Sequence, residues 1–218
     1  MRPLSLKPYL IDIYEVTADA YKACEASGRC QPAGRERECT AGKADRGRHP
    51  INCVTWYQAS AYCAAQTKRL PSTAEWVFAA TAGRGATFPW GNEPPDPKRL
   101  NAAGTEYRKY SLAKGFSAAD AHIAYHASDG FATTAPVGSF PAGASPFGVH
   151  DLAGNVAEWT GSADSDPLGV LTQPGRFMEQ RGGDWMSGHH DVVKVDASVG
   201  GGPNGSGETI GFRCAKTG

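Results

Sequence analysis

The stretch from Gly182 to Cys214 constrains the fold of this chain most. It begins with a glycine pair and a tryptophan, and it ends with the apolar run Ile-Gly-Phe before Arg-Cys. The 26 residues 184–209 between these ends include seven glycines and prolines and are otherwise mostly small or polar. Such a segment buries little of its own surface, and long irregular segments in compact domains are usually functional or disordered. Because both ends are apolar, we predict a functional loop held by a folded scaffold.

Length and charge limit the class of protein. The chain has 218 residues, 40% of them hydrophobic, and no repeat or low-complexity linker divides it, so we predict a single domain over residues 1–218. The formal net charge of +0 argues against nucleic acid as a partner, because such a partner requires a basic face. No run of residues is long and apolar enough to span a bilayer, so we expect no membrane insertion. The N-terminus leads without a signal peptide into an expected strand at 9–16, and we expect the chain to be part of a longer protein.

Six cysteines, at positions 24, 30, 39, 53, 63 and 214, indicate the compartment. An even number with five in the first third of the chain is typical of disulfides, and therefore of an extracytoplasmic, oxidising environment. Buried free thiols in a cytosolic domain are the alternative. A structural zinc site is less favoured because no pair has the C-x-x-C spacing.

Local sequence signals predict the start of three helices. Thr17 is suited to cap a helix that continues to about residue 24. Thr55 with Gln58, and Ser72 with Glu75, form two capping boxes, in which a hydroxyl and the side chain three residues later satisfy each other's backbone N–H groups.

Several ordered motifs resemble the formylglycine-generating enzyme, or sulfatase-modifying factor, family. They are RLPSTAEWVFAA, FPWGN, APVGSFPAG, GVHDLAGNVAEW and RGGDW…IGFRCA, and together they extend over residues 9–215. The resemblance implies an α+β fold of the C-type-lectin-like type, with two main helices, short strands and much irregular chain. It also implies a disulfide between Cys63 and Cys214. For the other four cysteines, which allow three pairings, we favour Cys24–Cys53 and Cys30–Cys39.

The family oxidases carry two cysteines after the GG-x-[WY] motif, which bind copper and oxidise a substrate cysteine to formylglycine. In this chain Ser187 lies near the first position, and His190 or Asp191 lies near the second. A soft Cu(I) ion requires a thiolate pair, which serine and aspartate do not replace, so we expect no copper.

Calcium is the cofactor that the resemblance predicts. Hard oxygen ligands from carboxylates, amides and backbone carbonyls suit this ion. The first expected set is Asp151, Gly154, Val156 and Glu158, and the second is Asn101, Ala102, Asp129 and Phe131. The alternative is that Asp151 and Glu158 make only turn and capping hydrogen bonds.

Two functions remain open. The first is a non-catalytic module whose loop at 184–209 binds an unknown protein or small molecule, as in retroelement-diversified variable proteins of this fold. The second is an oxidase of the family with altered metal ligands. The expected binding residues are Asp184, Trp185, Ser187, His189, His190, Asp191, Lys194, Asp196, Ser198, Asn204, Ser206 and Glu208. We expect Trp185 to lie in the core and the other residues to be mostly exposed.

Overall fold

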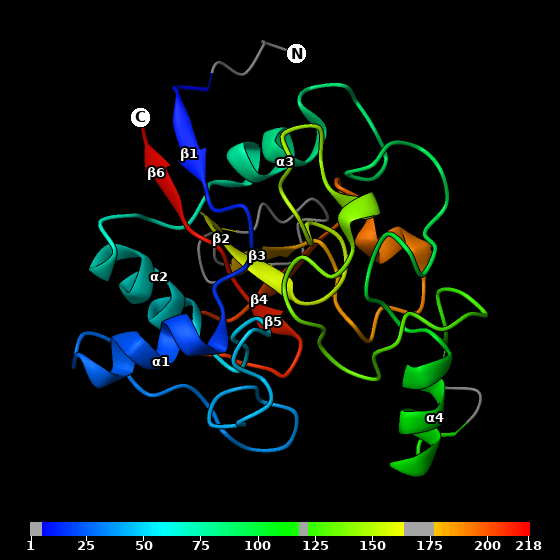
Figure 1. Cartoon of the computed structure of the whole chain (residues 1–218). Coiled ribbons are helices and arrows are strands. Elements are labelled where there is room, and N and C mark those ends of the chain that lie inside the picture. The colour runs from blue at the N-terminus through cyan, green and yellow to red at the C-terminus, as the bar shows by residue number, and fades with distance from the viewer. Residues whose placement is uncertain (1–5, 118–121, 164–176) are drawn as a thin grey trace.

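The computed structural model of the chain describes residues 6–117, 122–163 and 177–218 (Figure 1). Its helices and strands confirm the predicted α+β class. The helices are α1 (Ala18–Ala26), α2 (Trp56–Ala65), α3 (Thr73–Thr81) and α4 (Thr105–Ala113), with short 3-10 helices at Pro141–Gly143 and His190–Val193. The strands are β1 (Tyr9–Ile11), β2 (Ala157–Ala163), β3 (Met178–Arg181), β4 (Ser198–Gly201), β5 (Ile210–Gly211) and β6 (Ala215–Thr217).

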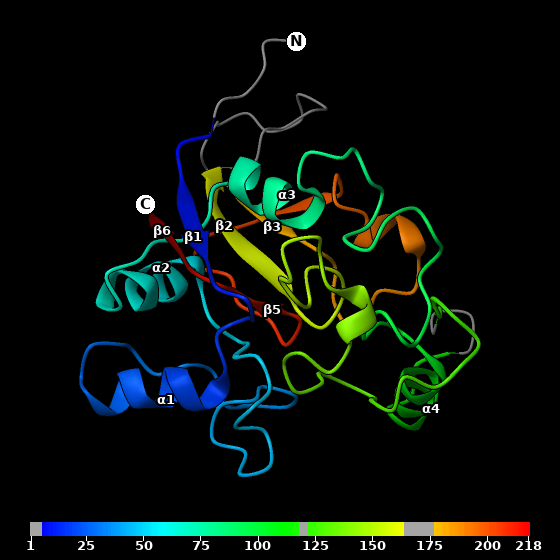
Figure 2. The same cartoon turned by 45° about the horizontal axis from the view of Figure 1, so that its top comes forward.

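The three predicted helix starts are confirmed. Thr17 Oγ1 accepts a hydrogen bond from the backbone N–H of Ala20 at 3.2 Å, at the start of α1. Both capping boxes before α2 and α3 are formed in full. Helix α4 lies on the opposite side of the molecule from α1 and α2 and was not predicted (Figures 1 and 2). It begins after Gly104, which has no side chain to cap it, so the sequence lacks the usual signal.

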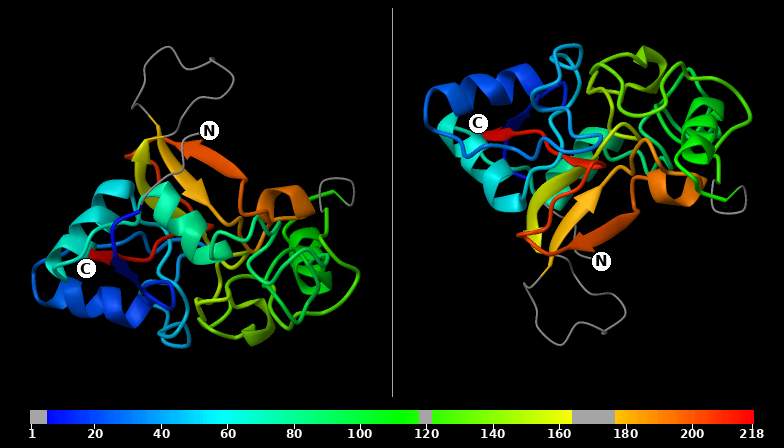
Figure 3. Two further views of the ribbon diagram at one scale, coloured as in Figure 1. Left: turned by 90° about the horizontal axis from the view of Figure 1, so that it is seen from above. Right: turned by 90° about the horizontal axis from the view of Figure 1, so that it is seen from below.

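The strands form two sheets. The larger has the order β4-β3-β2-β5, with β5 parallel to β2 and the other pairs antiparallel (Figure 3). The loop that follows Gly182 therefore leaves from the end of β3, returns to pair as β4, and rejoins the sheet as β5. In the smaller sheet β1 pairs with β6, which brings the two ends of the described chain side by side (Figure 2).

The largest hydrophobic core lies between the helices α1 and α2 and the strand β2. Tyr21 of α1 stacks on Tyr62 of α2, with ring centroids 5.4 Å apart, and Phe212 meets Tyr62 edge-on at 5.4 Å. Trp159 of β2 is fully buried in the same cluster, and its indole N–H donates to the carbonyl of Val54 at 3.0 Å. The core therefore fixes the C-terminal segment after β5 against the two N-terminal helices.

All six cysteines form disulfides, and one of the three predicted pairs is confirmed. Cys63 of α2 is bonded to Cys214, which follows β5. The other pairs are Cys24–Cys30 and Cys39–Cys53, so the predicted pairs Cys24–Cys53 and Cys30–Cys39 are wrong. A turn after α1, with Gly28 at φ +73°, reverses the chain and returns Cys30 to within 5.3 Å (Cα–Cα) of Cys24. Local chain reversal thus decides the pairing.

The Cys63–Cys214 bond is expected to stabilise the fold more than the Cys24–Cys30 bond. In the chain-entropy model, closing a loop of 151 residues contributes about 5 kcal/mol, whereas closing one of six residues contributes about 2 kcal/mol. We therefore expect the double variant Cys63→Ser/Cys214→Ser to lose about 3 kcal/mol more unfolding free energy than Cys24→Ser/Cys30→Ser. Urea unfolding of both variants and the parent measures this difference. Equal losses in the two variants would contradict the prediction.

Candidate functional site

A cavity of about 640 Å³ lies where the loop at 184–209 folds back on β3 and β4. Five of the predicted binding residues line it: Asp184, Ser187, His189, Asp191 and Ser198. Apolar wall is supplied by Ala157 of β2, Val199 of β4 and Ile210 of β5, together with Met186 and Val192 of the loop. The structure therefore brings polar groups from the N-terminal half of the loop to a partly apolar hollow beside the sheet.

Asp184 is the carboxylate whose position is best fixed in this cavity. Its Oδ1 accepts a hydrogen bond from the backbone N–H of Met186 at 2.8 Å and another from the Ser187 hydroxyl at 3.4 Å. The Ser187 hydroxyl oxygen in turn accepts from the backbone N–H of Asp184 at 2.9 Å. Burial raises the pKa of Asp184 to about 6, and within the described residues no ion pair joins its carboxylate to a cation. The cavity thus holds a partly desolvated acid that forms no ion pair among the described residues, and the cation that also lines the cavity, Arg181, is paired with Glu179.

Two glycines let the loop pack this closely. Gly183 has φ +66°, and a Cβ at this position would lie 2.7 Å from Val193 Cγ1 and 2.9 Å from the Val192 carbonyl oxygen. A Cβ at Gly188 would lie 2.7 Å from both Cβ and the carbonyl oxygen of His122. Any side chain at either position would force the loop away from its support, so glycine is required there.

Trp185 lies in the core, as predicted. It is 2% exposed, its indole N–H donates to the carbonyl of Glu208 at 3.1 Å, and Tyr107 and Tyr110 of α4 meet its ring edge-on. This contact connects the two ends of the loop and attaches both to α4. Trp185 is therefore a support of the loop rather than part of the cavity.

The other predicted binding residues differ in exposure. Ser187 is buried, at 8% exposed, so its predicted exposure is wrong: its hydroxyl is turned inward by the hydrogen bonds to Asp184. Asp184, Lys194 and Glu208 are half-buried. Those that are exposed are His189, His190, Asp191, Asp196, Ser198, Asn204 and Ser206.

The predicted residues do not form one surface. Ser206 and Glu208 line a separate hollow beside the Cys39–Cys53 disulfide. Lys194 forms an ion pair with Asp191 at 2.5 Å, and His190 Nε2 donates to the carbonyl of Ala124 at 2.8 Å. The apolar wall, in contrast, was missed because the prediction counted only polar loop residues. Val192, Val199 and Ile210 could have been found as the few large apolar side chains of an otherwise polar segment.

A pair of histidines borders the cavity. The rings of His122 and His189 lie 4.8 Å apart, centroid to centroid. In the part of the chain that the structure describes, no group of three or more His, Cys, Asp or Glu side chains is placed to hold a metal ion.

The first predicted calcium set does not fit the ion. Both carboxylate oxygens of Glu158 are engaged within the protein: Oε1 accepts from Arg213 at 2.7 Å, and Oε2 accepts from Arg213 Nε at 2.8 Å and from the Trp76 indole at 2.9 Å. Asp151 Oδ2 accepts from the backbone N–H of Gly138 at 2.6 Å. A dication beside the guanidinium of Arg213 would be repelled, so Glu158 serves as the partner of Arg213 instead.

The second predicted set fits calcium better. Asn101 is 1% exposed, and its Oδ1 is buried without a hydrogen-bond partner among the described residues, while its amide group donates to Thr133 and Asn155. Asp129 supplies a carboxylate nearby, held by the hydroxyl of Tyr125 and the backbone N–H of Phe131. A buried acceptor without a donor is a group that a cation would satisfy. Calcium at Asn101, Ala102, Asp129 and Phe131 stays a prediction.

Comparison with known proteins identifies the scaffold as that of the formylglycine-generating enzymes. The family model for the sulfatase-modifying factor enzyme 1-like domain matches residues 1–218, so the chain belongs to this family. It is 35% identical to the inactive C-alpha-formylglycine-generating enzyme 2 of Bos taurus over 195 residues, which cover 85% of this chain and 54% of that protein. It is 31% identical to the formylglycine-generating enzyme of Mus musculus, over 78% of this chain and 45% of that protein. The chain thus spans about half the length of these curated relatives.

Solved structures show the same fold. PvdO from Pseudomonas aeruginosa is 28% identical, with a TM-score of 0.70 over 96% of this chain and 80% of that one. Treponema denticola variable protein 1 is 22% identical, with a TM-score of 0.63 over 96% of this chain and 84% of that one. The similarity to this second structure shows that a variable protein has the same fold.

The acid in the cavity predicts that stability falls as the pH rises from about 4 to 7. A pKa of about 6 in the folded state, against about 3.9 in the unfolded state, means that the folded state binds a proton more tightly in this range. The stability that this proton contributes is present below about pH 4 and is lost as the pH rises through 6. Asp184→Asn is therefore expected to be more stable than the parent at pH 7 by about 1–2 kcal/mol, with the difference disappearing near pH 4.

Urea unfolding at several pH values measures this, with the exposed Asp196→Asn as the matched control. A difference that is independent of pH would show that Asp184 is not desolvated in the folded state.

Calcium is expected to raise the melting temperature through the second set of ligands. Binding to the folded state alone adds about 2.7 kcal/mol at a hundredfold excess over Kd. Asp129→Asn removes the charge while it keeps hydrogen-bonding capacity, so the calcium-dependent shift should be lost in this variant and kept in Asp151→Asn. Scanning calorimetry in calcium and in chelator tests both variants. An unchanged melting temperature for the parent would rule out calcium, and a shift lost only in Asp151→Asn would restore the first set.

Proposed function

We propose that this chain is a non-catalytic binding module and that the cavity behind the loop receives a cationic group of its ligand. The observation that carries the proposal is the Asp184 carboxylate, which lines the cavity, is held from one side by Met186 and Ser187, and has no counter-ion among the described residues. A partly buried carboxylate gains most from a partner of opposite charge.

The walls restrict the ligand further. Met186, Val192, Val199 and Ile210 supply apolar surface around the acid. An alkyl chain that ends in an ammonium or guanidinium group matches this combination, because its stem packs on apolar wall while its head meets the carboxylate. A lysine or arginine side chain of a partner protein is the class of ligand that we propose.

The family's oxidase chemistry has less support here. All six cysteines are in disulfides, so none is available as a thiolate for copper. Ser187, which lies near the position of a family cysteine, has its hydroxyl oxygen occupied by the backbone N–H of Asp184. The similarity to an inactive relative supports the same view. Copper content and oxygen uptake with a cysteine peptide test the oxidase directly.

The binding proposal is tested with short peptides that differ in one charge. The probes are acetyl-Ala-Lys-Ala-amide and acetyl-Ala-Arg-Ala-amide, and their neutral controls carry norleucine and citrulline in place of the basic residue. Chemical shifts of the chain's backbone amides, followed during titration, report both affinity and location. We expect only the basic peptides to give saturable shifts at the cavity residues. Asp184→Asn should lower the affinity for the basic peptides by about tenfold to a hundredfold, because a hydrogen bond to a charged group contributes about 1.5–3 kcal/mol.

Asp196→Asn is the matched control, since it removes one exposed charge from the same loop. An equal loss of affinity in both variants would show that only the net charge of the loop matters. Binding of the neutral peptides with the same affinity as the basic ones would refute the cationic ligand. If the loop is also diversified between copies, a reverse-transcriptase gene and a near-copy of the coding segment for 184–209 should lie in the neighbouring DNA.

A further inference from the structure

Strand β1 has one edge that pairs with no strand in the described part of the chain. Leu10 lies opposite Lys216 of β6, the backbone N–H of Asp12 donates to the carbonyl of Cys214 at 2.9 Å, and that of Gly218 donates to the carbonyl of Pro8 at 3.0 Å. Residues 8, 10 and 12 therefore direct their backbone groups toward β6. Because these directions alternate along a strand, Tyr9 and Ile11 direct theirs the other way, and β1 forms the end of its sheet.

An apolar groove of about 560 Å³ runs along this strand. Phe78 of α3, Phe147 and Val149 line it together with residues 6–11. The rings of Phe78 and Phe147 are in contact, with centroids 5.6 Å apart, and Phe147 remains 56% exposed. Exposed aromatic surface beside an unpaired strand edge is the combination that proteins usually cover.

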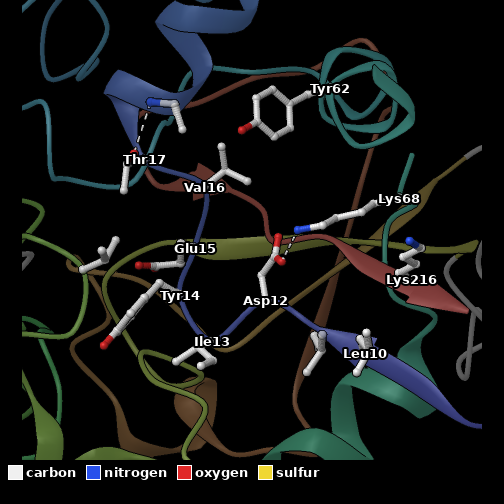
Figure 4. A pocket seen from close by; sticks show the side chains of 13 residues that line it. Leu10, Asp12, Ile13, Tyr14, Glu15, Val16, Thr17, Tyr62, Lys68 and Lys216 are labelled. Atoms are coloured by element: carbon white, nitrogen blue, oxygen red, sulfur yellow. Dashed lines mark hydrogen bonds and ion pairs between the residues drawn. The ribbon is translucent and has the colours of Figure 1, made fainter. Parts of the chain in front are cut away.

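The other face of β1 borders a second hollow of about 620 Å³ (Figure 4). Leu10, which is 67% exposed, lies here with Tyr62 and Lys216. In the close-up, Lys68 reaches Asp12, with which it forms an ion pair at 2.5 Å. A strand added to β1 would direct alternate side chains toward these two hollows, because successive side chains of a strand point to opposite faces.

The charges at this edge restrict what covers it. Lys68 is neutralised by Asp12, but Lys7 beside the first hollow and Lys216 beside the second are exposed and form no ion pair among the described residues. Glu15, in the wall of the second hollow, is 2% exposed and therefore contributes little charge at the surface. A second copy of this chain would bring Lys7 to an edge that is already basic.

We propose that the free edge of β1 is a docking site for an extended, acidic segment of a partner protein. The segment adds as a strand beside Tyr9 and Ile11, with apolar side chains toward Phe78 and Phe147 and acidic side chains toward Lys216. Backbone hydrogen bonds hold such a strand, and the alternate hollows select its side chains.

The probe is the dye-labelled peptide acetyl-Val-Glu-Val-Glu-Val-amide, whose apolar and acidic residues alternate. Its binding is followed by fluorescence anisotropy, with two peptide controls: the same sequence N-methylated at all five residues, which disrupts the added strand in either register, and acetyl-Val-Lys-Val-Lys-Val-amide, which reverses the charge. We expect saturable binding of the probe alone, and a loss of about tenfold or more in affinity for each control.

Phe147→Asp in the groove should weaken the probe by about tenfold. Phe116→Asp, at a residue that is similarly exposed (53%) but lies beyond α4, should not. Melting curves show whether either variant is folded, and the peptide controls test the proposal on the parent chain alone. Absence of saturable binding, or equal affinity for the lysine peptide, overturns it. Concentration-dependent dimerisation of the parent that Phe147→Asp abolishes would assign the edge to a second copy instead, and would also overturn it.

Discussion

The buried ion pair between Arg213 and Glu158 is the interaction on which the rest of the structure depends. The two side chains are 0% and 1% exposed and meet through two hydrogen bonds, of 2.7 and 2.8 Å. Arg213 also donates to the carbonyls of Asp12, Ile13 and His150. One guanidinium thus joins the segment after β1, the segment before β2 and the segment after β5. Removing either partner would leave an uncompensated charge in the core, a change that usually costs about 3–5 kcal/mol.

This arrangement explains how an irregular loop keeps a defined shape. Its far end is fixed twice, by Arg213 in the core and by the disulfide of Cys214 to α2. Its near end is fixed by the glycine pair, whose close packing admits no side chain, and by Trp185, which spans to Glu208. The loop therefore needs little secondary structure of its own to hold Asp184 at the cavity. The scaffold thus keeps the loop rigid, and the loop contributes the polar side chains that line the cavity.

Local features of this fold could be predicted from the sequence, and features that depend on distant contacts could not. The capping boxes at Thr55 and Ser72 are complete within four residues, so their helices were found. Helix α4 was missed because Gly104 gives no capping signal. The Cys63–Cys214 pair followed from family resemblance, but the other pairs depend on chain reversals that the spacing alone does not show.

The candidate site shows the same division. The polar residues of the loop were identified from composition, and Asp184, Ser187 and His189 do line the cavity. The apolar residues of the loop and of β5 were missed because the prediction counted only polar loop residues, and Ala157 was missed because β2 meets the loop only after folding. Glu158 was assigned to calcium from the family resemblance, and its partner Arg213, 55 residues away in the sequence, could not be recognised without the fold.

The antiparallel pairing of β1 with β6 also determines how this protein would respond to mechanical load. Tyr9 lies opposite Thr217 and Ile11 opposite Ala215, so the two outer ends of the strands are neighbours. Tension between these two strand ends would break the hydrogen bonds between β1 and β6 one after another. Breaking them in sequence requires less force than breaking them all at once by shear. The opening would stop at residue 214, where the disulfide to Cys63 transmits the tension to α2 through a covalent bond. Once the three residue pairs of β1 and β6 have opened, the C-terminal segment would therefore extend no further. The loop at 184–209 lies between the two bonded cysteines in the sequence and would carry no tension.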